Sequence, residues 1–329
     1  MSLSVGIVGL PNVGKSTLFN ALLRKQQAYA ANFPFATIEP NVGIVPVPDQ
    51  RLEILSKVIE KSEGKIPPIV PATIEFIDIA GLIAGAHKGE GLGNKFLSHI
   101  RQTDAICHVV RVFDDGDIIR EGSVNPKQDF EIIKTELELA DFETVEKHKQ
   151  KKNADVESLE LLSKKPYLVV LNVSEDSLKN AQEIESKYAE EFGINVDQVV
   201  AICARTEEQL AGFTQEESED YLKDLGIDSS GLERLIQKAY KTLGLISFMT
   251  AGVKEVRAWT IKNGFTAVEA SGAIHTDFMK KFIKADVVSL ADFESFGGWK
   301  LCRENGKVRS EGRDYIMQDG DVVEFKIGA

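Results

Sequence analysis

The chain has 329 residues, of which 43% are hydrophobic and 27% are charged, as in an ordinary globular protein of two or three domains. No apolar run approaches the roughly 18 residues that a membrane-spanning helix needs, and the first predicted strand follows Met1 too closely to leave room for a signal peptide. The net charge of −12 argues against indiscriminate binding of DNA or RNA through phosphate charge. The widely spaced Cys107, Cys203 and Cys302 indicate reduced core residues, so we expect a cytoplasmic protein.

The most specific motif lies near the N-terminus, between a predicted strand and a predicted helix. Residues 9–17 read Gly-Leu-Pro-Asn-Val-Gly-Lys-Ser-Thr, which fits the phosphate-binding pattern G-x-x-x-x-G-K-[ST]. Gly9 and Gly14 let the backbone turn tightly and aim N–H groups at phosphates, where the helix dipole is also positive. Lys15 can reach the β- and γ-phosphates, and the Ser16 hydroxyl can bind Mg²⁺. The predicted nucleotide-binding residues of this loop are Asn12, Val13, Gly14, Lys15, Ser16 and Thr17.

The elements that follow predict a doubly wound α/β sheet. Strands and helices alternate up to about residue 125, and the strand pattern resumes after a charged helical segment. A glycine-rich run at 85–93 suits a loop that becomes ordered when nucleotide binds. We expect strands near 3–8, 41–47, 73–78, 106–112, 167–171 and 198–203, and helices over 51–59 and 231–243.

The base of the nucleotide is predicted to lie after the strand at 167–171, because ligands of open α/β sheets bind at the carboxyl ends of the strands. Typical P-loop GTPases carry Asn-Lys-x-Asp there, and the aspartate accepts two hydrogen bonds from guanine. This chain reads Asn172-Val173-Ser174-Glu175. The longer glutamate side chain displaces the carboxylate by about one carbon–carbon bond, so the grip on guanine should be lost. Adenine, which offers an exocyclic amine and no N1–H, is the favoured base.

Two further segments flank or interrupt this domain. Residues 128–163 are charged and helical in pattern, and we expect an antiparallel helical hairpin whose second helix includes Val156, Leu159, Leu161 and Leu162. From residue 245 the order strand, strand, helix, strands predicts a ubiquitin-like β-grasp fold. We therefore expect a nucleotide-binding domain over 1–127 and 164–244, the hairpin over 128–163, and a C-terminal domain over 245–329.

Three lysines of the C-terminal domain offer the best candidate for a local RNA contact. Lys280, Lys281 and Lys284 fall in a helix predicted over 276–284. A solvated face of an amphipathic helix explains the same pattern, and the sequence does not separate the two interpretations.

Further motifs connect these features to a known family. Residues 32–41, Asn-Phe-Pro-Phe-Ala-Thr-Ile-Glu-Pro-Asn, resemble the first switch of Obg-related GTPases, and residues 76–82, Phe-Ile-Asp-Ile-Ala-Gly-Leu, resemble their second switch. With the Asn-x-x-Glu variant and the C-terminal segment, nearly the whole chain resembles the YchF/Obg-like ATPase family. The resemblance implies a C-terminal TGS domain, preference for ATP over GTP, slow hydrolysis, a cytoplasmic location and association with ribosomes. Family members usually carry a longer coiled-coil arm than 128–163 allows.

The resemblance also implies roles for residues around the γ-phosphate. Ser16 and Thr37 would be the Mg²⁺ ligands, and Asp78 would hold the metal through a water molecule. The N–H of Gly81 would meet the γ-phosphate. Ras-like enzymes place a water-positioning glutamine next, but this chain has Leu82, which can neither donate nor accept a hydrogen bond.

Two histidines are candidates for the catalytic role that Leu82 cannot fill. His108 matches a histidine that the family implicates in hydrolysis, although a lone histidine in an apolar strand is also typical of a core. His87 is a rival, because a glycine-rich loop beside the second switch could bring it to the γ-phosphate. In some relatives the residue corresponding to Asn12 helps to hold K⁺, which supplies positive charge.

Three functions remain open from the sequence. The first is a ribosome-associated ATPase that acts as a conformational switch. The second is an Obg-type GTPase in which Ser174 and Glu175 still hold guanine. The third is a nucleotide-stabilised ribosome-binding protein with incidental hydrolysis, which Leu82 in the glutamine position allows.

Overall fold

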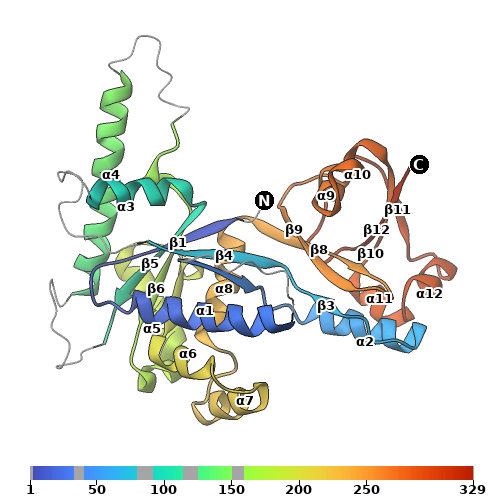
Figure 1. Cartoon of the computed structure of the whole chain (residues 1–329), viewed down its shortest axis with the longest axis horizontal. Helices are drawn as coiled ribbons and strands as arrows, with labels where there is room; N and C mark the ends of the chain where they lie inside the picture. Colours follow the sequence, from blue (N-terminus) through green and yellow to red (C-terminus); the bar gives the residue numbers. More distant parts are fainter. Residues whose placement is uncertain (1–2, 33–40, 80–91, 114–124, 150–158, 329) are drawn as a thin grey trace. The chain divides into compact units, whose positions relative to one another are not determined.

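The computed structural model describes residues 3–32, 41–79, 92–113, 125–149 and 159–328, and the chain divides into two compact units (Figure 1). The first unit comprises Met1–Val45 and Ile74–Leu243, and the second comprises Pro46–Thr73 and Gly244–Ala329. The segment 46–73 therefore groups with the C-terminal residues, whereas the sequence pattern placed it in the nucleotide-binding domain. In the described residues, no helix is long and apolar enough to cross a bilayer.

The first unit is built on a six-stranded sheet with the order β2-β4-β1-β5-β6-β7. β1 lies parallel to both β4 and β5, and β5, β6 and β7 are parallel in succession. The predicted doubly wound sheet is confirmed, and every residue of the central strands β1 and β5 is buried. The strands are β1 (Ser4–Val8), β2 (Val42–Pro46), β4 (Thr73–Asp78), β5 (Ala105–Arg111), β6 (Tyr167–Asn172) and β7 (Val199–Ile202).

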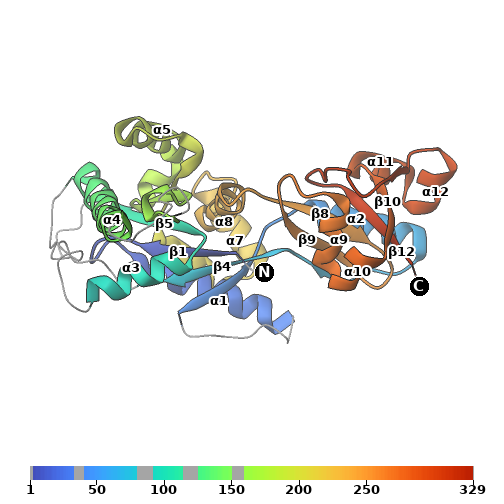
Figure 2. The same ribbon diagram turned by 90° about the horizontal axis from the view of Figure 1, so that it is seen from above.

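Helices cover both faces of this sheet. α4 and α5 lie on one side and α1 lies on the other (Figure 2). One cluster of buried apolar residues joins α4 and α5 to β5, β6 and β7, with Phe130 stacked on Phe192 at 4.6 Å between ring centroids. The helices are α1 (Lys15–Asn32), α3 (Leu92–Gln102), α4 (Pro126–Lys149), α5 (Ala181–Phe192), α6 (Ala204–Leu210), α7 (Gln215–Asp224) and α8 (Gly231–Thr242).

The inserted segment differs from the predicted helical hairpin. α4 forms its first helix, but residues 159–161 are not helical and Leu162–Lys164 form only a 3₁₀ turn. The predicted second helix is therefore wrong at Leu159, Leu161 and Leu162, and Val156 lies outside the described residues. The Asp141 carboxylate of α4 accepts hydrogen bonds from the N–H groups of Leu162 and Ser163, both at 2.8 Å. Pro166 follows two residues after the turn and disfavours a helix before it.

The second unit has its own six-stranded sheet, in the order β11-β10-β12-β8-β9-β3. The hairpin β8–β9 is antiparallel, and the last strand, β12, lies parallel to β8 and antiparallel to β10. This arrangement matches the predicted β-grasp. The strands are β3 (Ile69–Val70), β8 (Leu245–Ala251), β9 (Val256–Lys262), β10 (Phe282–Val288), β11 (Arg309–Glu311) and β12 (Val322–Ile327), and the helices are α2 (Arg51–Glu63), α9 (Ala267–Ile274), α10 (Thr276–Lys281), α11 (Leu290–Phe296) and α12 (Trp299–Glu304).

The segment 46–73 joins this unit through a strand and an ion pair. β3 pairs in parallel with β9, and α2 packs against α11. Arg51 of α2 bonds both Asp49 and Asp319, at 2.7 and 2.8 Å. Periodicity within 46–73 could not reveal β9, α11 and Asp319 as partners, because all three are distant in the sequence; Asp319 lies 268 residues beyond Arg51.

Two smaller predictions concern lysines and cysteines. The helix expected over 276–284 ends at Lys281, so Lys284 lies on β10, where its ammonium pairs with Asp286 at 2.8 Å. The three lysines are therefore not on one helix face. Cys107, Cys203 and Cys302 are free and buried, as expected.

Candidate nucleotide-binding site

The phosphate-binding loop connects β1 directly to α1, and its glycines are required by the geometry. Gly14 has φ +100°, and a Cβ there would lie 2.2 Å from Nδ2 of Asn172. A Cβ at Gly9 would lie 2.5 Å from the carbonyl oxygen of Val109. The N–H of Leu18 already bonds the Gly14 carbonyl at 3.0 Å, so the first helical turn begins within the motif. The loop thus places backbone N–H groups at the positive end of the α1 dipole.

Lys15 and Asp78 form the charged part of this end. The Lys15 ammonium donates to the Leu10 carbonyl at 2.7 Å, and burial lowers the pKa of this lysine while Asp78 partly opposes the shift. Burial raises the pKa of Asp78, and Lys15 opposes that shift in turn. Asp78 ends β4 and is in register with Ile7 of β1, which brings it to the edge where the loop begins.

Oxygen donors suited to Mg²⁺ are present at the same edge. Ser16 is exposed and lines the cavity described below, and Asp78 is half-buried near Lys15. A hydroxyl and a carboxylate are ligands that Mg²⁺ accepts alongside phosphate oxygens. Thr37, Gly81, Leu82 and His87 lie outside the described residues.

Asn172 links the expected phosphate end of the site, at residues 9–17, to the expected base end, at residues 172–175. Its Nδ2 donates to the Val13 carbonyl at 2.9 Å, and its Oδ1 accepts from the N–H of Ala204 at 3.1 Å. One buried side chain at the end of β6 therefore holds the phosphate-binding loop and the start of α6 together. Both bonds go to backbone atoms, so Asn172 acts here as a clamp on the loops.

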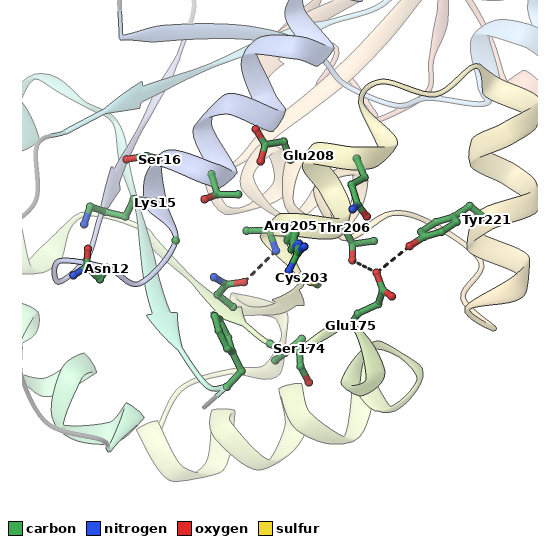
Figure 3. A pocket seen from close by; sticks show the side chains of 17 residues that line it. Asn12, Lys15, Ser16, Ser174, Glu175, Cys203, Arg205, Thr206, Glu208 and Tyr221 are labelled. Atoms are coloured by element: carbon green, nitrogen blue, oxygen red, sulfur yellow. Dashed lines mark hydrogen bonds between the residues drawn. The ribbon is translucent and has the colours of Figure 1, made fainter. Parts of the chain in front are cut away.

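A cavity of about 1080 Å³ extends from the loop to the end of β6, wide enough for a nucleotide (Figure 3). Its far end holds Glu175, whose Oε2 accepts hydrogen bonds from Thr206 of α6 at 2.7 Å and Tyr221 of α7 at 3.0 Å. The cavity is lined by Asn12, Gly14, Lys15, Ser16, Thr17, Phe113, Asn172, Val173, Ser174, Glu175, Cys203, Ala204, Arg205, Thr206, Glu208, Gln209 and Tyr221.

Sequence reasoning missed several of these side chains, among them Thr206, Tyr221 and Phe113. Thr206 and Tyr221 come from helices whose contact with Glu175 no local pattern indicates. Phe113 lies two residues beyond β5, with the Arg111 guanidinium 4.4 Å from its ring centroid. An aromatic ring next to a strand end was the signal available, since bases stack on aromatic faces.

Val173 and His108 occupy the protein interior. Val173 is 2% exposed and belongs to the α4–α5 cluster, although it also contributes to the cavity wall. His108 on β5 stacks on Phe130 of α4 with ring centroids 5.5 Å apart. Burial, with a smaller contribution from Lys15, lowers the pKa of His108 to about 3. His108 is not among the residues that line the nucleotide cavity, and its stacking partner is on α4.

Two family models match the chain. Residues 4–173 match the model described as a 50S ribosome-binding GTPase. Residues 245–328 match YchF-GTPase_C, described as a protein of unknown function. The chain is 46% identical to the ribosome-binding ATPase YchF of Bacillus subtilis and 44% identical to that of Escherichia coli O157:H7, each match covering 99% of both chains.

The chain belongs to the YchF family.

A solved structure agrees with this assignment. The Schizosaccharomyces pombe YchF GTPase is 34% identical, with a TM-score of 0.83 over 99% of this chain and 98% of that one. The printed names of these YchF relatives differ in the nucleotide, since the bacterial proteins are called ATPases and the yeast protein a GTPase. ATP and GTP differ only in the base, so residues 172–175, which line the cavity, are the part of the chain that bears on this difference.

The comparison also bears on the inserted segment. The alignment with the Bacillus subtilis YchF protein runs over 369 positions, while this chain has 329 residues. At least 40 aligned positions therefore have no counterpart in this chain. A shortened arm over 128–163 stays a prediction, because the length of the alignment does not place these positions along the chain.

Proposed function

We propose that this chain is a P-loop ATPase that binds ATP and slowly hydrolyses it to ADP and phosphate as a conformational switch. The observation that carries the proposal is Glu175, which lines the same cavity as Lys15 and takes the place of the aspartate that grips guanine. The bacterial relatives named ATPases support the choice of nucleotide. The phosphate-binding loop supports triphosphate binding, because its geometry presents N–H groups and an ammonium to one end of the cavity.

The proposed partner is the ribosome or a ribosomal subunit. The relatives in Bacillus subtilis and Escherichia coli are named ribosome-binding, and the model matching 4–173 is described in the same terms. A ribosomal partner supports a cytoplasmic location, and the proposed partners include neither a membrane nor DNA. We also propose that 128–163 is a short arm inserted between 1–127 and 164–244, and that 245–329 is a TGS domain.

Mg²⁺ is the proposed cofactor, held by Ser16 and Thr37 and, through water, by Asp78. When bound, it would neutralise charge on the triphosphate oxygens. Lys15 orients the same phosphates, and Gly81 would donate its N–H to the γ-phosphate. Asn12 is exposed with φ +61° in the loop, and we propose it as the residue that would hold K⁺. Equal hydrolysis rates in sodium and potassium buffers would remove the K⁺ proposal.

His108 and His87 remain the proposed residues for the hydrolytic step. The stacking of His108 on Phe130 means that a direct role would require its side chain to leave the core. Single-turnover hydrolysis by His108→Ala and His87→Ala, with nucleotide affinity measured in parallel, tests both. Unchanged turnover in both variants with intact binding would reject both assignments.

A GTPase is the second candidate, favoured by the printed names of the yeast relative and the N-terminal family model. The deciding experiment measures Kd and turnover for ATP and GTP in Mg²⁺ buffer with the full chain. We expect tighter ATP binding and faster ATP hydrolysis. Tighter GTP binding would replace the ATPase with an Obg-type GTPase.

Ribosome binding needs a separate measurement. Co-sedimentation with ribosomes in the apo, ADP and non-hydrolysable ATP states should differ between states if nucleotide drives a switch. Identical binding in all three states would favour a nucleotide-stabilised binding protein with incidental hydrolysis. Absence of co-sedimentation in every state would contradict the proposed partner.

A further inference from the structure

The base end of the cavity contains two hydroxyl donors directed at one oxygen of Glu175. Thr206 donates to Oε2 at 2.7 Å, and Tyr221 donates to the same atom at 3.0 Å (Figure 3). The three residues come from separate elements, because Glu175 follows β6, Thr206 is in α6 and Tyr221 is in α7. Such convergence of separate elements on a single carboxylate oxygen fixes that side chain in position.

Both donors are held by their surroundings. Thr206 is 0% exposed within α6, so its hydroxyl depends on an internal partner. The Tyr221 ring meets Phe213 edge-on at 5.6 Å, and a capping box between Thr214 and Glu217 fixes the start of α7. A tyrosine phenol is protonated at neutral pH, and the hydrogen bond to Glu175 raises the pKa of Tyr221 further, so its hydroxyl is available as a donor.

The number of free acceptor sites on the Glu175 carboxylate limits how many hydrogen bonds a base can donate to it. Each carboxylate oxygen has about two lone-pair sites, and the two hydroxyls occupy both sites of Oε2. Guanine recognition of the Asn-Lys-x-Asp type needs both oxygens at once, one for N1–H and one for the exocyclic amine. Adenine presents only its exocyclic amine as a donor on this edge, so one oxygen is enough.

We propose that Tyr221 and Thr206 are positioning residues for base selection, which occupy Oε2 of Glu175 and leave Oε1 as the single acceptor for the amine of adenine. This inference rests on the proposed adenine-nucleotide function and adds its physical cause. Selection then depends on the two hydroxyls as well as on the length of the glutamate side chain. Residues outside the Asn-x-x-Glu motif therefore contribute to the choice of nucleotide.

The test removes the hydroxyls and keeps the side-chain shapes. Calorimetric titrations of the full chain with ATP, GTP and ITP compare the wild type with Tyr221→Phe, Thr206→Val and the double variant. ITP carries the N1–H of guanine without its exocyclic amine. It can therefore donate one hydrogen bond to the carboxylate, whereas GTP can donate two and needs both oxygens. Tyr188→Phe on α5 is the matched control, because Tyr188 packs on Phe192 away from the cavity.

We expect the ratio of the GTP Kd to the ATP Kd to fall about tenfold in the double variant, with GTP gaining more than ITP. Tyr221→Phe alone should give part of the change, and Tyr188→Phe none. An unchanged ratio, or equal weakening of all three nucleotides, would overturn the inference, because the hydroxyls would then serve only the packing of α6 and α7.

The two proposals can fail separately. A wild type that binds GTP as tightly as ATP would overturn the ATPase proposal, and the inference with it. A wild type that prefers ATP, together with a double variant that prefers ATP by the same factor, would overturn the inference alone. Melting temperatures check that each variant is folded, and Tyr221→Phe, which keeps the ring against Phe213, allows the test even if Thr206→Val unfolds.

Discussion

The phosphate end of the cavity, at residues 9–17, consists mainly of backbone groups, whereas the base end, around Glu175, consists mainly of side chains. Backbone atoms dominate the phosphate end, where residues 9–17 fold into a loop whose shape depends on two glycines. Side chains dominate the base end, where Glu175 is held by hydroxyls from two other helices. Affinity for a triphosphate should therefore depend on a short continuous segment, and choice of base on contacts between distant residues. Variants at the two ends should separate these properties.

The largest effect is expected at the phosphate end from Lys15→Ala. The variant loses the ammonium that we propose orients the phosphates, and hydrolysis should fall about 100-fold or more, for ATP and GTP alike. Phosphate release under saturating nucleotide is the measurement. Lys25→Ala on the same helix is the control, since Lys25 pairs with Glu233 at 2.9 Å and does not line the cavity. Equal losses in the two variants would contradict the role of Lys15.

Gly14→Ala tests the shape of the loop. The new Cβ would meet Nδ2 of Asn172 at 2.2 Å in a backbone conformation that already disfavours side chains. We expect a loss of about 2–4 kcal/mol in unfolding free energy, with weaker binding of both nucleotides. Gly64→Ala is the matched control, because Gly64 has φ +72° and a Cβ there would have no atom within 4 Å, so this change should cost only about 1 kcal/mol. Similar urea midpoints for both variants would mean that the loop can relax around the extra methyl group.

Asn172→Ala should act on both ends together. It removes the bonds to Val13 and Ala204 and leaves two buried backbone groups without that partner, at about 1–3 kcal/mol. Affinities for ATP and GTP should fall by a similar factor, because Asn172 bonds loops rather than the base. Asn305→Ala, at an exposed helix end in the other unit, is the control. A selective loss of one nucleotide would instead assign Asn172 to base recognition.

The smallest expected effect is a pH dependence from His108. Its pKa is about 3 in the folded chain and about 6.5 when unfolded, so the unfolded chain binds a proton between these values that the folded chain does not. Stability should therefore fall as pH drops through 6.5, by about 1.4 kcal/mol between pH 7.5 and 5.5. Urea unfolding of the wild type and His108→Leu at both pH values isolates this contribution. Equal pH slopes would show that His108 is not a buried neutral histidine.

The same contrast, between local segments and contacts of distant residues, explains which parts of the structure could be predicted from the sequence. The phosphate-binding loop and the strands of the first sheet follow from local patterns, so their positions are confirmed to within a residue or two. The partners of Glu175 lie 31 and 46 residues away, and no periodicity indicates that they meet. The placement of 46–73 with the C-terminal sheet was missed for the same reason. The second arm helix was wrong at residues 159–162, where hydrogen bonds to Asp141 and the nearby Pro166 oppose the helix that apolar spacing predicted.

The most direct test of the central claim replaces residues within 172–175 by those of the Asn-Lys-x-Asp pattern, which binds guanine. ATP and GTP affinities are measured for the wild type, for Glu175→Asp, and for Glu175→Asp combined with Val173→Lys. Glu208→Asp is the control, because Glu208 lines the same cavity and pairs with Arg24. We predict tighter binding of ATP by the wild type and a shift toward GTP in the exchanged variants. Tighter GTP binding by the wild type, or an unchanged preference in folded exchanged variants, would contradict the account.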